Sequence, residues 1–217
     1  MNLKIKIFIA VLSLAANSFA QNVSRLQSPD GNIVFSFRLI NSLPVYSVDF
    51  KKSNLVSSSL LNLDAGNGGF KKIIIDKTIY SAGIDNYELV VGKTKRVNDQ
   101  YNQLIISMED KGNNSFKTDL EIRAFNDGIA FRYRFPLQNS NPSFSLFEEL
   151  TQFRFSSDPI VKALLLPNYT SSHEGLYTAL PLSELKEDTL MDMPSLFEFP
   201  NQIFVAITEA ALVDYAG

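Results

Sequence analysis

Apolar and polar residues alternate along much of this chain, and this period of two is the feature that most limits its possible folds. In residues 33–40, the apolar side chains Ile33, Phe35, Phe37 and Leu39 all fall on one side of the pattern. Successive side chains of a β-strand point to opposite faces, so this pattern predicts a strand with one buried face. The preceding turn sequence, Pro29-Asp30-Gly31, is typical of a strand entry.

Similar segments recur and predict further strands at residues 44–50, 71–75, 87–91, 104–108, 120–125 and 203–207. Asp127 and Gly128 separate two of the alternating segments, which is a strong hairpin signal. Convincing helical periodicity is missing from the sequence beyond residue 20. We therefore predict a single all-β domain, a large antiparallel β-sandwich of two packed sheets.

The first twenty residues have the pattern of a signal peptide. Lys4 and Lys6 supply a basic start, residues 7–16 form an apolar core, and Ser18-Phe19-Ala20 provides a small-residue cleavage site. The apolar run is shorter than the ~20 residues of a membrane-spanning helix. We expect cleavage after Ala20 and export to the periplasm, and the absence of cysteine excludes a lipoprotein membrane anchor.

The charge of the chain also limits its partners. The formal net charge is −3 and the pI is about 5.2, whereas a nucleic-acid-binding domain needs a basic face, so we expect no nucleic-acid partner. The chain contains no cysteine and a single histidine, which excludes thiolate metal sites and any pair of histidine ligands.

Few residues are candidates for chemistry. His173 would have to serve any Ser-His-Asp arrangement, but its polar surroundings favour a solvated or loop-bracing histidine. Glu148 and Glu149 are adjacent, so on a strand they point to opposite faces and cannot form an acid/base pair. Arg132 and Arg134 could bind a sugar or a carboxylate, or could form the solvated face of a half-buried strand. We predict no catalytic residue and assign no substrate-binding residue.

Five motifs, in order along the chain, resemble the N-terminal domain of glycoside hydrolase family 97, the bacterial α-glucosidases and α-galactosidases of starch-utilisation systems. They are SPDG at residues 28–31, NDGIAFRYRFP at 126–136, ELTQF at 149–153, EGLYTALPLS at 174–183 and TEAALVDY at 208–215. The resemblance implies a mutarotase-like super-sandwich over residues 21–217, followed in the family by a catalytic (β/α)8 barrel that this sequence lacks. The apolar final residues agree with a fragment that is inactive alone.

The resemblance also implies one metal ligand. In the family, a glutamate of this region joins barrel glutamates around a calcium ion, and Glu209 matches that position. One glutamate cannot complete the six to eight oxygen ligands of calcium, so the metal would be shared with the barrel. Alternatively, Glu209 is a strand-end carboxylate in a salt bridge or in solvent. Asp214 is not included as a ligand.

The implied function is that of a non-catalytic domain in an exported α-glycosidase. It would wall the active-site cleft against the intramolecular barrel, where an α-linked oligosaccharide of glucose or galactose is hydrolysed. A stand-alone periplasmic carbohydrate-binding or adhesive β-sandwich is the alternative, and a purely structural sandwich is a third possibility. Retention or inversion, and the choice of sugar, depend on residues outside this sequence.

Overall fold

The computed structural model of the protein describes residues 23–66, 68–113, 115–137 and 144–210. The expected signal peptide at residues 1–20 and the final residues 211–217 lie outside these ranges. Across the described ranges, no helix combines the length and the apolarity that crossing a bilayer requires.

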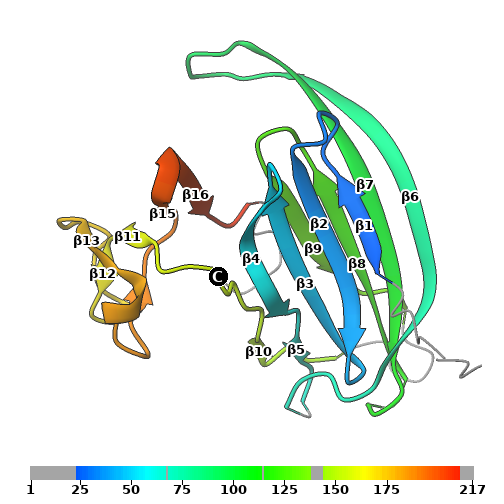
Figure 1. The fold of residues 1–217 in the computed structure, drawn as a ribbon. Helices are drawn as coiled ribbons and strands as arrows, with labels where there is room; N and C mark the ends of the chain where they lie inside the picture. Colours follow the sequence, from blue (N-terminus) through cyan, green and yellow to red (C-terminus); the bar gives the residue numbers. More distant parts are fainter. Residues whose placement is uncertain (1–22, 67, 114, 138–143, 211–217) are drawn as a thin grey trace, which may run out of the picture.

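Two four-stranded antiparallel sheets form the main body and face each other (Figure 1). The first has the order β1-β2-β3-β4 and the second the order β6-β7-β8-β9. The strands of the first sheet are β1 (Ser24–Gln27), β2 (Ile33–Ile40), β3 (Leu43–Phe50) and β4 (Ser53–Leu60). Those of the second are β6 (Ile73–Glu88), β7 (Arg96–Asp110), β8 (Phe116–Ala124) and β9 (Ile129–Arg134). The predicted antiparallel β-sandwich is thereby confirmed.

Strand β2 follows the alternation of the sequence. Ile33, Phe35 and Phe37 are buried, and the residues between them are partly exposed. The turn before the strand depends on Gly31, whose φ of 74° is favourable mainly for glycine. Ser28 accepts the N–H of Gly31 through its carbonyl, and this closes the turn.

The core between the two sheets is built from the inward faces of β2, β3, β7 and β8. Phe35 stacks on Tyr46 with ring centroids 5.5 Å apart, and Leu104, Ile106 and Leu120 are 0% exposed. Each such side chain contributes roughly 1.5–3 kcal/mol by burial, before the loss of conformational entropy is counted. This shared core is what joins the two sheets into one sandwich.

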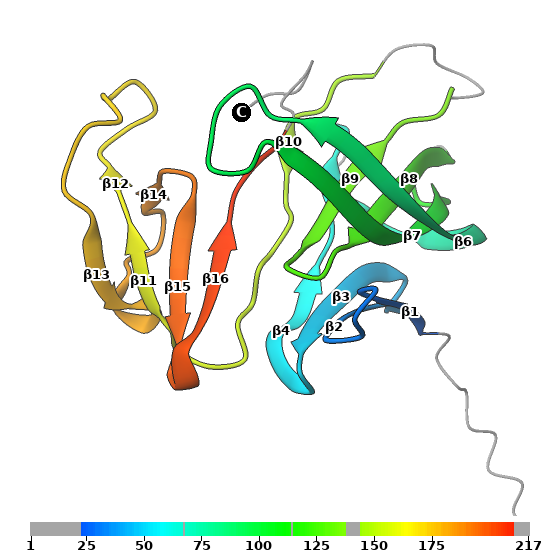
Figure 2. The ribbon, with the colours of Figure 1, turned by 90° about the horizontal axis from the view of Figure 1, so that it is seen from above.

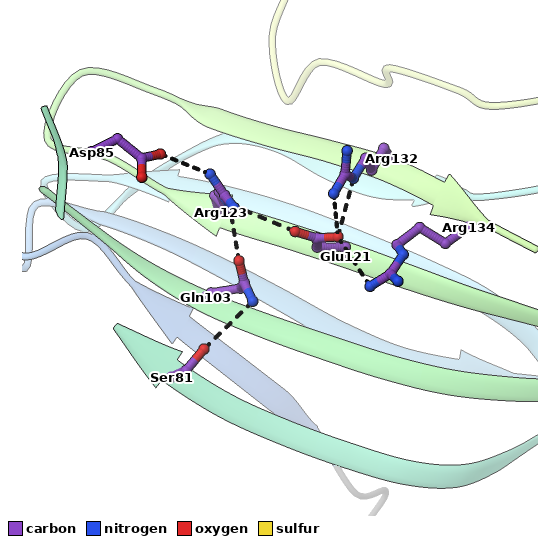
Figure 3. Close-up of polar contacts among 7 residues, drawn as sticks. All are labelled: Ser81, Asp85, Gln103, Glu121, Arg123, Arg132 and Arg134. Atoms are coloured by element: carbon purple, nitrogen blue, oxygen red, sulfur yellow. Dashed lines mark hydrogen bonds and ion pairs between the residues drawn. The ribbon is translucent and has the colours of Figure 1, made fainter. Parts of the chain in front are cut away.

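The predicted hairpin at Asp127 and Gly128 connects β8 to β9. Phe125 donates its N–H to the carbonyl of Gly128, and Ala124 lies opposite Ile129 in the first pair of the ladder. Ile129, Phe131, Tyr133 and Phe135 pack against the core, as the alternation predicts. Arg132 and Arg134 lie on the outer face of the sheet (Figure 3).

The β6–β7 hairpin corrects one strand prediction. Residues 71–75 and 87–91 were expected as two separate strands, but a single strand, β6, runs through the intervening residues and ends at Glu88. Leu89, Val90 and Val91 belong instead to the exposed tip between β6 and β7, with Val90 99% exposed. The tip extends beyond the other strands and bends over them (Figure 1). In the part of the chain that the structure describes, no opposing sheet buries these apolar side chains.

A smaller antiparallel sheet stands beside the sandwich, in the order β13-β11-β15-β16 (Figure 2). Its strands are β11 (Ile160–Ala163), β13 (Thr178–Pro181), β15 (Ser195–Phe199) and β16 (Ile203–Ile207). Two short pairs and two 3-10 helices complete the described elements. They are β5 (Leu63–Asp64) with β10 (Glu148–Glu149), β12 (Leu165–Leu166) with β14 (Leu190–Met191), η1 (Leu182–Glu184) and η2 (Pro200–Gln202). The sequence patterns predicted β16 but not the rest of this sheet.

The segment of residues 147–156 joins the sandwich to the small sheet and runs beside β5 and β4. Five backbone hydrogen bonds attach this segment to the sandwich. In each pair the first residue donates its N–H to the carbonyl of the second: Phe147 to Asp64, Leu150 to Asn62, Gln152 to Leu60, Ser57 to Arg154 and Ser156 to Leu55. The ELTQF motif at residues 149–153 therefore lies along the sandwich, although only Glu149 of that motif belongs to a named strand. A second core, built around Val161, Phe197 and Phe199, packs with Leu55 of β4.

Candidate functional site

Glu209 lies two residues beyond the end of β16, at the edge of the small sheet. It is exposed, as expected for a carboxylate that follows a strand. Among the described residues, no three His, Cys, Asp or Glu side chains gather closely enough to hold a metal ion. Calcium takes six to eight oxygen ligands, so the one carboxylate of Glu209 does not by itself form a calcium site.

The remaining acidic and histidine candidates do not form a catalytic arrangement. His173 Nδ1 lies 3.0 Å from Asp192 Oδ2, and this contact braces the loop between β12 and β13. Ser171 donates its hydroxyl to the carbonyl of Asn168 instead of to His173. His173 therefore has the loop-bracing contact that its sequence context predicts.

The short strand β10 contains Glu148 and Glu149. They lie opposite Asp64 and Leu63 of β5 respectively, and both glutamates are exposed. Because adjacent residues of a strand point to opposite faces, we still expect that these two carboxylates form no acid/base pair. Glu184 and Glu187, farther along the chain, are exposed residues as well.

The most developed polar cluster lies on the outer face of the β6-β7-β8-β9 sheet and is centred on Glu121 (Figure 3). Glu121 is 5% exposed although it points away from the core. Arg132 of β9 donates from Nε and Nη2 to its Oε2, at 3.0 and 2.9 Å. Arg134 and Arg123 approach the same carboxylate, each at 3.6 Å. Three guanidinium groups therefore cover this one carboxylate.

Arg123 extends the cluster across the sheet. Its Nε donates to Oε1 of Gln103 on β7 at 2.9 Å, and its Nη1 lies 3.1 Å from Oδ2 of Asp85 on β6. Its guanidinium also stacks over the ring of Tyr101, 4.2 Å from the ring centroid. Gln103 in turn donates to Ser81 Oγ at 3.5 Å, so the cluster reaches from β9 to β6 (Figure 3).

A second acidic group lies farther along the same hairpin. Asp99 of β7 is directly opposite Asp85 of β6. Partial burial, followed by the negative charges of Asp127 and Asp85, raises the pKa of Asp99 above its ordinary value. At the other end of β7, the pKa of Glu109 is lowered by hydrogen bonds from Lys111 and Ser115.

The arrangement around Glu121 binds four strands together and does not resemble a hydrolytic centre. Glycoside hydrolysis needs two carboxylates facing each other across the scissile bond, about 5 to 9.5 Å apart. Here Glu121 and Asp85 are instead held by the same arginine, Arg123. The structure agrees with the interpretation that Arg132 and Arg134 form the outer face of a half-buried strand. Both arginines also contact the carboxylate of Glu121.

Sequence reasoning missed Glu121, because a glutamate at an outward strand position looks like an ordinary solvated residue. Its partner across the β8–β9 ladder is Arg132. Once the hairpin at Asp127 and Gly128 is placed, counting outward from the turn brings these two residues opposite each other. The hairpin therefore contained the signal that could have identified the pair.

Comparison with known proteins identifies a family that this chain matches. Residues 26–217 match the family described as Glycosyl-hydrolase 97 N-terminal. A retaining alpha-galactosidase of Bacteroides thetaiotaomicron is 29% identical, over 91% of this chain and 30% of the relative. This chain thus spans about a third of the length of the curated relative.

Solved structures agree with this comparison. A glycoside hydrolase family 97 enzyme of Pseudoalteromonas sp. strain K8, solved in complex with panose and with acarbose, has a TM-score of 0.79 at 27% identity. The match covers 89% of this chain and 29% of that enzyme. A beta-arabinopyranosidase with a TM-score of 0.74 and 22% identity shares the fold.

Proposed function

Because this chain belongs to glycoside hydrolase family 97, as its N-terminal domain, we propose that it is the non-catalytic sandwich of an exported α-glycosidase. The extent of the family match carries this proposal. The match runs from residue 26 to residue 217, yet the chain corresponds to only 30% of the curated relative. The catalytic carboxylates would then belong to the part of the enzyme that follows this domain.

The proposed substrate class is an oligosaccharide with α-linked glucose or galactose. One relative is named as a retaining alpha-galactosidase, and the enzyme of Pseudoalteromonas was solved with panose and with acarbose. The sandwich would form one wall of the cleft in which such a sugar is bound. The sugar and the stereochemical course would be set by the catalytic part.

Within that enzyme we assign Glu209 the role of a calcium ligand. Its exposed carboxylate follows an edge strand, where a neighbouring domain can reach it. Carboxylate oxygens suit calcium, which would supply positive charge at the edge of the active site. We also propose cleavage after Ala20 and a periplasmic location, which mass spectrometry of the exported protein would test by an N-terminus at Gln21.

The activity experiment compares this chain alone with the same chain joined to the catalytic region of a family 97 enzyme. We expect hydrolysis of p-nitrophenyl α-galactoside or α-glucoside by the joined protein, and background rates for this chain alone. Turnover by the chain alone that disappears when one of its own carboxylates is replaced would contradict the non-catalytic role.

The calcium assignment is tested in the joined protein with Glu209→Gln. This change keeps the size and one acceptor oxygen but removes a charge, so we expect weaker calcium binding and a lower rate. Added calcium should recover part of the rate, since a binding defect responds to mass action. Glu187→Gln, at another exposed glutamate, is the matched control. Equal calcium titrations for both variants would show that Glu209 is not a ligand.

A stand-alone carbohydrate-binding sandwich remains the alternative, and calorimetry distinguishes it. The proposed domain should bind maltooligosaccharides and α-galactosides weakly or not at all without the catalytic part. Tight binding by this chain alone, with no gain in activity on joining, would favour the alternative.

A further inference from the structure

Strand β6 is a long edge strand with one side unpaired. It runs from Ile73 to Glu88 and pairs with β7, and within the described ranges no strand pairs with its other side. Beyond Ile75, nearly all of its residues are exposed. An edge of this kind presents a row of free N–H and C=O groups, which is a template for pairing with another strand.

Proteins usually protect such an edge. Among the described residues, features that protect β6 lie only at its two ends. A register shift between Ile75 and Lys77 interrupts the ladder at one end, and Asp85 and Glu88 carry charges at the other. Residues 78–84, with the sequence TIYSAGI, contain neither a charge nor a proline. Within them Tyr80 is 54% exposed and Ile84 is 52% exposed. High β-propensity without charge is the composition that favours strand association.

We propose that a second copy of this chain pairs with β6, antiparallel and about a twofold axis that passes through Ser81. The axis follows from the sequence, because Ser81 is the middle residue of the uncharged stretch 78–84. Placing that stretch opposite itself pairs residues whose numbers add up to 162. A twofold contact uses the same surface on both subunits and closes at a dimer.

This register brings together side chains that complement one another in charge. Lys77 of each copy lies opposite Asp85 of the other, and the symmetry repeats the pair. Asp85 is half exposed in the single chain, so it can accept a lysine while it remains bound to Arg123. Opposite charges in directly facing positions stabilise a sheet.

The same register also complements size. Tyr80 lies opposite Ala82, and Ile79 lies opposite Gly83, so each large side chain faces a small one. Gly83 has little room for a larger residue, because a Cβ atom there would lie 2.5 Å from the hydroxyl of Tyr101. The small residue that faces Ile79 is therefore required by the fold of the single chain as well.

Neighbouring registers that keep the same faces are less favourable. A shift in one direction, to residue numbers that add up to 164, places Asp85 opposite Ile79 and Lys77 opposite Tyr87. The opposite shift, to a total of 160, places Lys77 opposite Gly83 and leaves Asp85 beyond the register shift that lies between Ile75 and Lys77. Of these three registers, the charges favour the one whose paired numbers add up to 162, because it alone places Lys77 opposite Asp85. This inference does not rest on the proposed enzyme function.

Sedimentation equilibrium of the purified chain tests the proposal, together with charge exchange at the facing pair. We expect a monomer–dimer equilibrium whose dissociation constant rises about tenfold in Lys77→Glu, since two attractive pairs become repulsive. Asp85→Lys should weaken the dimer in the same way. The double variant Lys77→Glu/Asp85→Lys should recover most of the affinity, because the pairs are restored with reversed polarity. Lys186→Glu, on an exposed loop of the small-sheet region, should leave the dissociation constant unchanged.

A second measurement does not depend on variants. Amide hydrogen exchange of residues 78–84 should slow as the protein concentration is raised, while that of the tip residues 89–91 should not change. Circular dichroism of each variant checks that the sandwich is folded. A monomer at every concentration would overturn the proposal, as would a dimer that the double variant fails to restore or exchange rates that ignore concentration.

Discussion

The two halves of the β6–β7 hairpin have the same strand geometry but opposite surroundings. At the base, Ile73, Leu104, Ile106 and Met108 are buried against the facing sheet. In the distal half, which extends past that sheet, Ile84 and Tyr87 stay about half exposed. The residue types are similar in both halves. Whether an apolar strand residue joins the core is therefore decided by the reach of the opposing sheet, not by the strand itself.

The largest expected difference between the halves comes from a matched pair of truncations. Ile106→Ala, at the base, should lower the free energy of unfolding by about 3 kcal/mol, because it removes buried methyl groups and leaves a cavity. Ile84→Ala, in the distal half, should change it by less than about 0.5 kcal/mol. Urea denaturation at a concentration where both variants are monomeric measures the two values. Similar losses would mean that the distal half is buried in solution.

A smaller difference is expected for the polar residues on the outer face. Glu121→Ala should destabilise the chain by about 2 kcal/mol, because a nearly buried carboxylate loses charge-assisted hydrogen bonds from Arg132. Asp85→Ala, which removes an exposed ion pair of the distal half, should cost about 0.5 kcal/mol or less. Arg132→Ala serves as a check, since it should reproduce part of the loss at Glu121. An equal cost at Glu121 and Asp85 would contradict a central role for the Glu121 cluster.

The smallest expected effect is on the pH dependence of stability. The pKa of Asp99 is raised in the folded chain, so its ionised form is unfavourable above that pKa and the penalty is relieved as the pH falls through it. Asp99→Asn should therefore be slightly more stable than the parent chain at pH 7, and the advantage should disappear under acidic conditions. Urea titrations between about pH 3.5 and 7 measure the difference. An advantage that grows on acidification would contradict the raised pKa.

Glu109, at the base of the same strand, should affect the pH dependence of stability in the opposite direction. Its pKa is lowered from 4.5, so its contribution to stability is present above that value and is lost as the pH falls through the lowered pKa. Replacing its partner, in Lys111→Ala, should move the pKa of Glu109 back toward 4.5, which an NMR titration of the carboxyl group measures. An unchanged titration of Glu109 would show that the 2.6 Å contact with Lys111 does not persist in solution.

The sequence predicted the body of the fold because burial there follows a local pattern. The alternation of residues 33–40 and the Asp127-Gly128 turn each specify a structure through neighbouring residues alone. The prediction failed at residues 89–91, since no local pattern records where the opposing sheet ends. It also missed most of the small sheet, whose strands have only four or five residues. The position of Glu209 beyond a strand was predictable, whereas the enclosure of Glu121 depends on arginines from a neighbouring strand.

The hydrogen-bonded segment of residues 147–156 has a consequence for any group that the small sheet presents. A flexible linker would let that sheet sample many orientations, and a second domain would have to select one of them on contact. Here the connecting backbone is fastened to β4 and β5 over most of its length. The orientation of β16 is therefore fixed when the domain folds. The position of Glu209 relative to the sandwich is fixed with it. If Glu209 binds calcium as we propose, its carboxylate would reach the metal with little further loss of entropy, which is the advantage of a preorganised site.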